Sequence, residues 1–274
     1  MDKLKSYFLA TALAGVLYLG ATQISFGQDL IVDGPFSSFT SPAGGELTTT
    51  AAGGYTGVTL SAWSSGGYIF VFPSGNEGDG PDVASSFGTN FSLWGSNNGG
   101  LTTLTAPPDG GDVVAADGAY RVGPLSQVVS GLTSGQTYAV SFEWAGAQQS
   151  GFNGATTESW TVSLGAPGLT GVASASIPGA LTTPVVDDNS HSATPWMSQT
   201  FDFTATGASE TLYFLATGTP NGVPPFSLLG DVTMTAVPVP EPKASAGWTL
   251  LFVMLTMAGN WVRHRYQNKS AASA

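Results

Sequence analysis

Cysteine is absent from the 274-residue chain, which excludes disulfide bonds, thiol catalysis and thiolate-bound zinc. Basic residues are almost as scarce, because the stretch from Asp29 to Pro240 contains sixteen carboxylates, one arginine (Arg121) and no lysine. The resulting net charge of −15 excludes nucleic-acid binding, which needs a Lys/Arg surface against the phosphates. The absence of lysine also excludes P-loop and Schiff-base mechanisms in this stretch.

The first 27 residues have the three parts of a secretory signal peptide. Two lysines lie within the first five residues, and an uncharged, mostly apolar run follows from Tyr7 to Leu19. Ser25 and Gly27 then place small residues at positions −3 and −1 of a cleavage site. The apolar run is short for a membrane span. We predict a signal peptide over residues 1–27, cut between Gly27 and Gln28, and hence an exported protein. The alternative is an uncleaved anchor.

The C-terminus carries a long uncharged run between a proline-rich segment and a basic tail. Val237–Pro242 reads Val-Pro-Val-Pro-Glu-Pro, and nineteen residues without a charge follow, from Ala244 to Val262. At about 1.5 Å per residue, a helix of that length spans roughly 28 Å, one hydrocarbon thickness. Basic residues stay on the cytoplasmic side of a membrane. We predict a transmembrane helix over 244–262, a basic tail over 263–274, and a body outside the inner membrane.

This C-terminal arrangement resembles the PEP-CTERM sorting signal of Gram-negative bacteria. Pro240, Glu241 and Pro242 match its tripeptide, and Arg263 and Arg265 match its basic cluster. The resemblance implies that an exosortase-type sorting protease reads residues 237–274. It also implies an inner-membrane-anchored precursor and a mature form at the cell surface or outside the cell, in a host that makes exopolysaccharide. The alternative is a plain C-terminal anchor.

Alternation of apolar and polar residues dominates the segment between the two ends. Tyr138, Val140, Phe142 and Trp144 share one face of an extended segment, and the residues between them are mostly polar. Several such segments, joined by Gly-, Pro- and Asn-rich connections, predict an all-β body over residues 28–236, a jelly-roll β-sandwich with one wet face. A disordered Gly/Ser/Thr-rich stalk is the rival interpretation, against which the many aromatic residues argue.

Three motifs in the body resemble the galactose-binding-like jelly rolls of carbohydrate-binding modules and DUF642-type proteins. They are the opening Asp29–Phe36, the middle stretch Asp117–Tyr138 and the ending Leu229–Met234. The resemblance implies one jelly-roll domain. It also implies a structural calcium ion, although Gly230 replaces an aspartate of the ending motif. These motifs are signatures of strands and turns, so they do not specify a ligand.

Signals for catalysis are missing from the body. No serine has glycine at both −2 and +2, which excludes a nucleophile elbow. His191 is the body's one histidine and lies in a polar segment, where we expect a loop histidine rather than a catalytic base. Glu143 and Glu158 lie beside strand aromatics, and we expect both carboxylates to be solvated. We therefore predict that the protein is not an enzyme, with hydrolase activity as a minor alternative.

Acidic loops are the candidate metal sites. The densest runs from Asn76 to Asp82, where Asn76, Asp79 and Asp82 supply the oxygen ligands that calcium prefers. The loop does not match an EF-hand. A structural Ca²⁺ is the one cofactor that the sequence suggests, and merely solvated acidic turns are the alternative.

Sugar binding requires an exposed aromatic ring beside polar groups. Trp144, Gln148 and Gln149 have that composition where a predicted strand enters a loop. The competing interpretation places Trp144 in the core. Arg121 either pairs with a carboxylate or contacts a ligand. Three further tryptophans lie near glycine- or serine-rich segments: Trp63, Trp94 and Trp196.

The sequence as a whole indicates an exported, non-enzymatic cell-surface protein that associates with neutral extracellular or envelope polysaccharide. The net charge of the body should repel anionic polysaccharide unless calcium bridges the two. The alternative is a structural surface-coat or biofilm-matrix protein with no specific glycan ligand.

Overall fold

The structure is a computed structural model, and it describes residues 27–41, 43–47, 57–76, 78, 90–238, 254–258, 260, 261 and 263. The chain divides into two compact units, Met1–Val237 and Pro238–Ala274. Most of the predicted signal peptide, and the whole Pro240–Pro242 tripeptide, lie outside the described residues.

Apart from Pro238, the described part of the second unit is helical. Residues 254–258, 260, 261 and 263 are in helical conformation with exposed side chains, and the rest of the predicted helix 244–262 lies outside the described residues. No helix among the residues that the structure describes is both long and apolar enough to cross a membrane. The transmembrane helix therefore stays a prediction.

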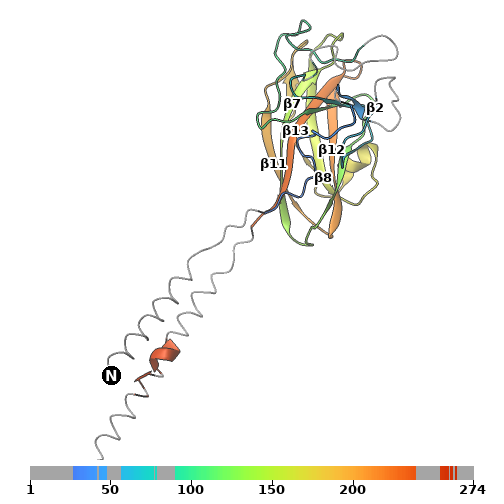
Figure 1. Cartoon of the computed structure of the whole chain (residues 1–274). Coiled ribbons are helices and arrows are strands. Elements are labelled where there is room, and N and C mark those ends of the chain that lie inside the picture. The colour runs from blue at the N-terminus through green and yellow to red at the C-terminus, as the bar shows by residue number, and fades with distance from the viewer. Residues whose placement is uncertain are drawn as a thin grey trace, which may run out of the picture. The chain divides into compact units, whose positions relative to one another are not determined.

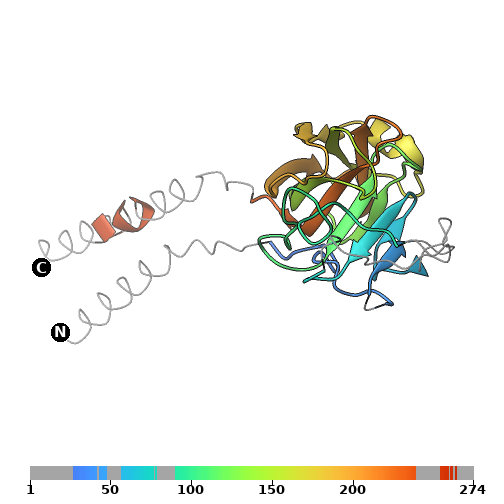
Figure 2. The same ribbon diagram turned by 90° about the horizontal axis from the view of Figure 1, so that it is seen from above.

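The first unit contains a seven-stranded sheet (Figure 1). Its strand order is β11-β7-β13-β5-β4-β1-β2, and all neighbours are antiparallel except the parallel pair β1 and β2. In Figure 2 the colours run from blue through cyan to green across one half of this sheet, so its early strands lie together at one edge. The strands are β1 (Gly45–Leu47), β2 (Gly57–Val58), β4 (Ile69–Phe72), β5 (Val113–Asp117), β7 (Thr137–Gln148), β11 (Met197–Thr204) and β13 (Pro225–Ala236).

A six-stranded sheet forms the second layer. Its order is β10-β8-β12-β6-β3, with β9 also paired to β8. A single 3₁₀ turn, Gly171–Ser176, follows β8. The strands are β3 (Ser64–Ser65), β6 (Leu125–Ser130), β8 (Thr156–Gly165), β9 (Leu181–Thr182), β10 (Val186–Asp188) and β12 (Ser209–Thr219). Two sheets built almost wholly from antiparallel strands confirm the predicted β-sandwich and are consistent with a jelly roll.

The main core lies between the two sheets, where the alternating apolar residues of both meet. Phe142 of β7 packs edge-on against Phe214 of β12, with ring centres 5.1 Å apart. Trp160 of β8 also packs edge-on against Phe214, at 6.0 Å, and its indole N–H donates to the Leu228 carbonyl. Side chains at alternate positions of a strand point to one face, which explains why the period-2 pattern identified these residues.

A second apolar cluster covers the other face of the seven-stranded sheet. Phe70 of β4 and Phe226 of β13 belong to it. Ile69 and Leu229 lie on the opposite face of the same two strands and belong to the main core. Phe91, from the segment before β5, stacks on Phe70 with ring centres 3.8 Å apart. The prediction that one face of the sheet is exposed to solvent is therefore wrong for this half of the sheet, because a loop that carries Phe91 covers it.

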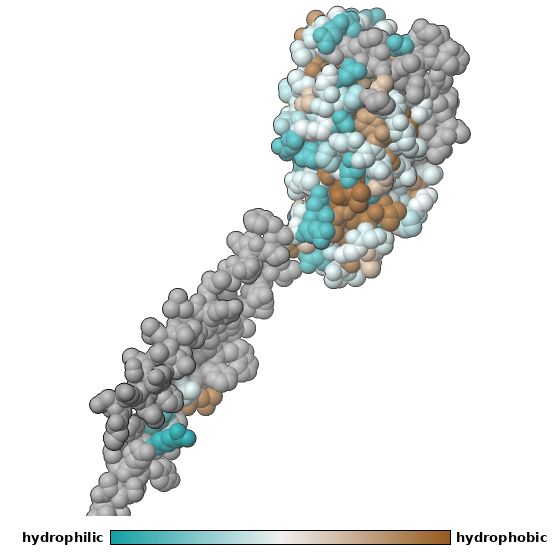
Figure 3. All heavy atoms as spheres, in the orientation of Figure 1, coloured by the Kyte–Doolittle hydropathy of each residue, from teal (hydrophilic) through white to brown (hydrophobic). Residues whose placement is uncertain are grey.

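The surface of the body is mainly polar. Figure 3 shows one face with mostly hydrophilic and intermediate residues and one patch of hydrophobic residues in the lower half of the body. Exposed hydroxyl side chains bond to one another across neighbouring strands, as Ser141 does with Thr200 and Thr157 with Thr219. Such pairs stabilise a sheet without presenting apolar area to water.

Candidate ligand-binding pocket

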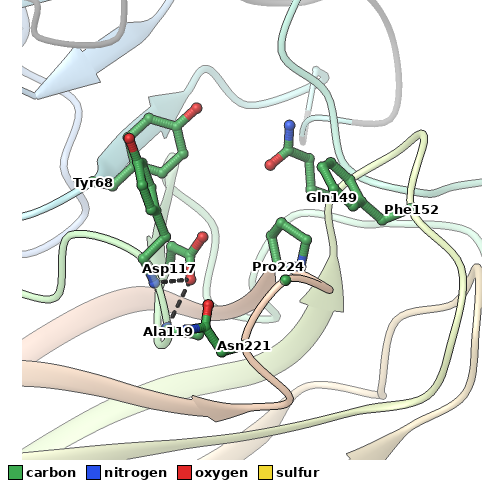
Figure 4. A pocket seen from close by; sticks show the side chains of 9 residues that line it. Tyr68, Asp117, Ala119, Gln149, Phe152, Asn221 and Pro224 are labelled. Atoms are coloured by element: carbon green, nitrogen blue, oxygen red, sulfur yellow. Dashed lines mark hydrogen bonds between the residues drawn. The ribbon is translucent and has the colours of Figure 1, made fainter.

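A pocket of about 310 Å³ lies at one end of the seven-stranded sheet. The neighbouring strands β7, β13, β5 and β4 alternate in direction, so the end of β7, the start of β13, the end of β5 and the start of β4 meet at this edge. Figure 4 shows Tyr68 on one side of the pocket and Gln149 and Phe152 on the other. The lining residues are Tyr68, Asp117, Ala119, Tyr120, Gln149, Phe152, Asn221, Gly222 and Pro224.

Three aromatic rings line the pocket. Tyr68 is buried and packs edge-on against Phe70 of the second apolar cluster, with ring centres 4.8 Å apart. Tyr120 is 51% exposed and meets Tyr68 edge-on at 5.3 Å. Phe152 is 37% exposed on the facing loop. The pocket therefore offers two partly exposed rings and one ring that is anchored in the core.

Asp117 places a carboxylate in this apolar setting. It is the last residue of β5 and is 3% exposed. Its Oδ1 accepts hydrogen bonds from the backbone N–H groups of Ala119 (2.7 Å) and Tyr120 (2.9 Å). Its Oδ2 has no hydrogen-bond partner among the described residues. Burial raises the pKa of Asp117 from 3.8 to about 6, against the lowering effect of the two N–H bonds. The carboxylate is therefore fixed in place with one oxygen left to accept a bond.

The opposite wall is held by bonds between loops. The backbone N–H of Gln149 donates to the Pro224 carbonyl at 3.2 Å. The indole N–H of Trp94 donates to the Phe152 carbonyl at 2.9 Å, and the Trp94 ring lies 4.3 Å from that of His191. Asn221 adds a second amide to the lining. These contacts make the wall a preorganised surface rather than a free loop.

Such a lining is suited to a polyhydroxylated, uncharged molecule. Aromatic faces pack against the C–H faces of a ring, while a carboxylate and amides bond to hydroxyl groups. Asp117 is the only carboxylate among the nine lining residues. Glycoside hydrolysis normally uses two, so the lining supports binding and supplies no acid/base pair.

The three residues predicted to bind a glycan have different locations. Trp144 is 1% exposed in the main core, so the ligand platform expected there is wrong and the competing core interpretation holds. Gln148 is fully buried, where its amide donates to the Gly154 carbonyl (2.7 Å) and accepts from the His191 N–H (2.9 Å). Gln149 lines the pocket. Side chains alternate between the two faces of β7, and Trp144 lies on the face that points into the main core.

The three further candidate tryptophans of the body, Trp63, Trp94 and Trp196, form no exposed platform. Trp63 is buried in the main core. Trp94 and Trp196 are half-buried, and each donates its indole N–H to a backbone carbonyl, Trp196 to that of Thr105 at 2.9 Å. Arg121 lies with its guanidinium 5.5 Å from the ring centre of Tyr120, a cation–π contact beside the pocket.

The predicted calcium loop is only partly described. Asn76 is described and bonds through its N–H to the Pro73 carbonyl (2.9 Å), whereas Asp79 and Asp82 lie outside the described residues. Within the described ranges, no three His, Cys, Asp or Glu side chains are arranged to hold a metal ion. The calcium site at Asn76, Asp79 and Asp82 stays a prediction.

The two strand glutamates are buried, so the expectation that both are solvated is wrong. Glu143 points away from the main core, but the loop before β5 covers it and the Asp109 N–H donates to its carboxylate (3.2 Å). Burial raises the pKa of Glu143. Glu158 follows the inward row of Trp160 and lies between the sheets, where burial raises its pKa to about 8. His191 lies in a loop, and its ring contacts Trp94 and Asn153.

The sorting residues can be placed only in part. Gly27 is half-buried and Gln28 is exposed, and the cleavage between them stays a prediction. Arg263 is helical and exposed. Pro240, Glu241, Pro242 and Arg265 lie outside the described residues.

Sequence reasoning missed the main pocket residues. Asp117 and Tyr120 belong to a motif that indicated a strand and a turn, and Tyr68 belongs to no motif. The sequence did offer one signal for these residues: an acidic residue at the end of a predicted strand with an aromatic residue shortly after it. Such residues are candidates for a site because binding residues often lie where strands end in loops. Phe152 was near the predicted site, in the loop that follows Gln149.

Comparison with known proteins gives no family assignment. No family model matches the chain, and no curated protein matches it. Similar solved structures include the CBM22-1 xylan-binding domain of Xyn10C from Paenibacillus barcinonensis, at 13% identity and a TM-score of 0.32, covering 78% of this chain and 97% of that one. TmCBM61 in complex with β-1,4-galactotriose is similar at 13% identity and a TM-score of 0.29, covering 65% and 90%. A CBM4 structure is similar at 17% identity and a TM-score of 0.30, covering 54% and 87%. Likenesses this remote carry no argument about this chain's ligand.

Proposed function

We propose that this chain is an exported, non-enzymatic cell-surface protein whose body binds a neutral polysaccharide in the pocket at Asp117. One observation carries the proposal: a buried carboxylate oxygen without a described partner lies beside the partly exposed rings of Tyr120 and Phe152. A buried acceptor of this kind gains most from a ligand hydroxyl, because a bond to a charged group is stronger than a neutral one.

The charge of the body favours a neutral ligand over an anionic one. Sixteen carboxylates against one arginine repel uronate, sulfate and phosphate groups. Arg121 is the one cation near the pocket, and its charge lies over the Tyr120 ring. A chain of uncharged sugars meets no such repulsion.

The proposed export and sorting of the protein rest on its two terminal segments. The basic and apolar N-terminus supports export, and the Pro240–Pro242 tripeptide, apolar run and Arg263/Arg265 cluster support PEP-CTERM sorting by an exosortase at the inner membrane. In this proposal the mature protein lies at the envelope surface of a Gram-negative bacterium. Replacing Glu241 by alanine, or deleting residues 263–265, should leave an unprocessed, misplaced precursor. Unchanged mass and location would contradict the sorting proposal.

Affinity electrophoresis of the full chain in detergent tests the glycan proposal. Native gels would contain a neutral xylan, galactan or glucan, or the anionic alginate. We expect at least one neutral polysaccharide to retard the protein and alginate to have no effect. Asp117→Asn should lose the retardation, while the control Asp202→Asn, on the exposed face of β11, should keep it.

The electrophoresis experiment also separates the proposal from its rival. No retardation in any neutral gel would favour a structural surface-coat or matrix protein without a specific glycan. Retardation that survives Asp117→Asn would place glycan binding elsewhere on the body.

A further inference from the structure

Four oxygen atoms lie buried between the two sheets without a hydrogen-bond partner in the described part of the chain. Two are Oε1 and Oε2 of Glu158, a residue that is 0% exposed. The others are Oγ1 of Thr156 and Oδ2 of Asp188, each in a residue that is 2% exposed. Buried polar atoms are almost always bonded, so a group of four calls for a specific partner.

The strand register places the three side chains together. Thr156 and Glu158 are two residues apart on β8 and so point to the same face. Asp188 of β10 pairs directly with Thr156, and Val186 pairs with Glu158. Asp188 is therefore the diagonal neighbour of Glu158, a spacing across which side chains can share a ligand.

Gly146 of β7 makes room for this cluster from the facing sheet. A Cβ atom at that position would lie 2.6 Å from Oε2 of Glu158 and 3.2 Å from Cγ2 of Val186. The Glu158 carboxylate thus occupies the space that a side chain of β7 would fill. Oε2 of Glu158 therefore faces the backbone of β7 at Gly146.

No cation among the described residues neutralises the cluster. The charges that act on Glu158 are those of Asp188 and Asp187, and both are negative. The only basic residue of the body, Arg121, has its guanidinium over Tyr120. Unpaired buried charge is strongly unfavourable, so a proton or a bound cation must compensate it.

We propose that Glu158, Asp188 and Thr156 hold a Ca²⁺ ion between β8 and β10. A single proton neutralises only one of the two carboxylates and leaves a buried negative charge, whereas a calcium ion neutralises both and accepts six to eight oxygen ligands. The Thr156 hydroxyl belongs to the same cluster, because it is buried and lies close enough to the Glu158 carboxyl to lower its pKa. Carboxylate and hydroxyl oxygens select a hard cation over a transition metal.

The remaining ligands and the entry path can come from the Asp188 side. A cavity of about 230 Å³ is lined there by Asp188, Asn189, Ser192 and Thr194, among others. That volume holds several water molecules. Oδ1 of Asp188 accepts from the Ser192 hydroxyl, which fixes the carboxylate and leaves Oδ2 as the oxygen available to a ligand. The site shares no residue with the Asn76–Asp82 loop or with the glycan pocket, so it does not depend on the proposed function.

Terbium luminescence of the full chain in detergent micelles tests the site. Terbium replaces calcium on oxygen ligands and emits when a nearby tryptophan is excited. Trp160 lies two residues from Glu158, and Trp144 lies two residues from Gly146. We expect saturable emission that calcium displaces, and a melting temperature that calcium raises above its value in chelator.

The variants locate the ion. Glu158→Gln and Asp188→Asn should each reduce the emission at least tenfold, and Thr156→Val should weaken terbium binding while keeping the strand intact. The matched control is Glu143→Gln, since Glu143 is also buried but already accepts a bond from Asp109. Circular dichroism of each variant shows that it is folded. If Glu158→Gln or Asp188→Asn does not fold, the effect of Thr156→Val on terbium binding still tests the site.

Three results would overturn the proposal. Emission that is unchanged in the folded variants, or lost in Glu143→Gln, would place the ion elsewhere. Absence of any terbium or calcium effect, together with equal melting temperatures for Glu158→Gln and the wild type in chelator at pH 7, would show that a proton neutralises the cluster.

Discussion

Asp117→Asn should stabilise the protein at neutral pH while it removes glycan binding. In the folded state, burial raises the pKa of Asp117 from 3.8 to about 6. The folded state therefore binds this proton more tightly than the unfolded state, and the stability that it contributes is lost as the pH rises from about 4 to 6. A shift of roughly two pKa units corresponds to about 3 kcal/mol of folding free energy at pH 7.

Asparagine removes the buried charge and retains the acceptor for the Ala119 and Tyr120 N–H groups. We expect the variant to match the wild type near pH 4 and to exceed its free energy of unfolding by up to about 3 kcal/mol at pH 7. Denaturant unfolding of the full chain, followed by circular dichroism at pH 4, 5, 6 and 7, measures this difference. Asp202→Asn, which removes a carboxylate at an exposed site, is the matched control.

The reasoning would be refuted by a constant difference between variant and wild type across this pH range. A variant less stable than the wild type at pH 7 would also refute it, because the carboxylate would then be stabilising rather than poorly solvated in the folded protein.

Three further substitutions test the packing, the pocket wall and the glycine at the buried carboxylates. Trp160→Ala removes a fully buried indole that packs on Phe214, and should cost about 3–5 kcal/mol in denaturant unfolding; a cost below 1 kcal/mol would contradict the core assignment. Trp94→Phe removes the N–H bond to the Phe152 carbonyl, a loss of about 1 kcal/mol, and should weaken glycan retardation about fivefold with little change in melting temperature; unchanged retardation would separate this wall from binding. Gly146→Ala places a methyl group against the Glu158 carboxylate and should destabilise the fold by about 1–3 kcal/mol in chelator; a neutral result by differential scanning calorimetry would show that Glu158 can move.

The main core could be predicted from the sequence because its strands are long and alternate. Strands β7, β8 and β12 have ten or more residues each, so the period-2 pattern of Phe142, Trp160 and Phe214 is clear. The second apolar cluster could not be predicted this way. Phe70 and Val113 belong to short strands that are buried on both faces, and a short apolar run does not say which loop covers it.

The pocket depends on long-range topology. Tyr68, Gln149 and Asn221 come from three separate connections and Asp117 from the end of β5, and only the strand order β7-β13-β5-β4 brings them together. Gln149 was predicted because composition at the end of a strand is a local signal. Trp144 was wrongly assigned to a ligand because the same local signal does not show that its alternating face is buried.

Isothermal titration calorimetry at pH 7 tests the central claim most directly. The titrant is an oligosaccharide prepared from the neutral polysaccharide that retards the protein, and the samples are the wild type, Asp117→Asn and Asp202→Asn. We predict saturable one-site binding to the wild type and to Asp202→Asn, and at least tenfold weaker binding to an Asp117→Asn variant that is folded and more stable than the wild type. Equal affinity for all three proteins would contradict a binding site at Asp117.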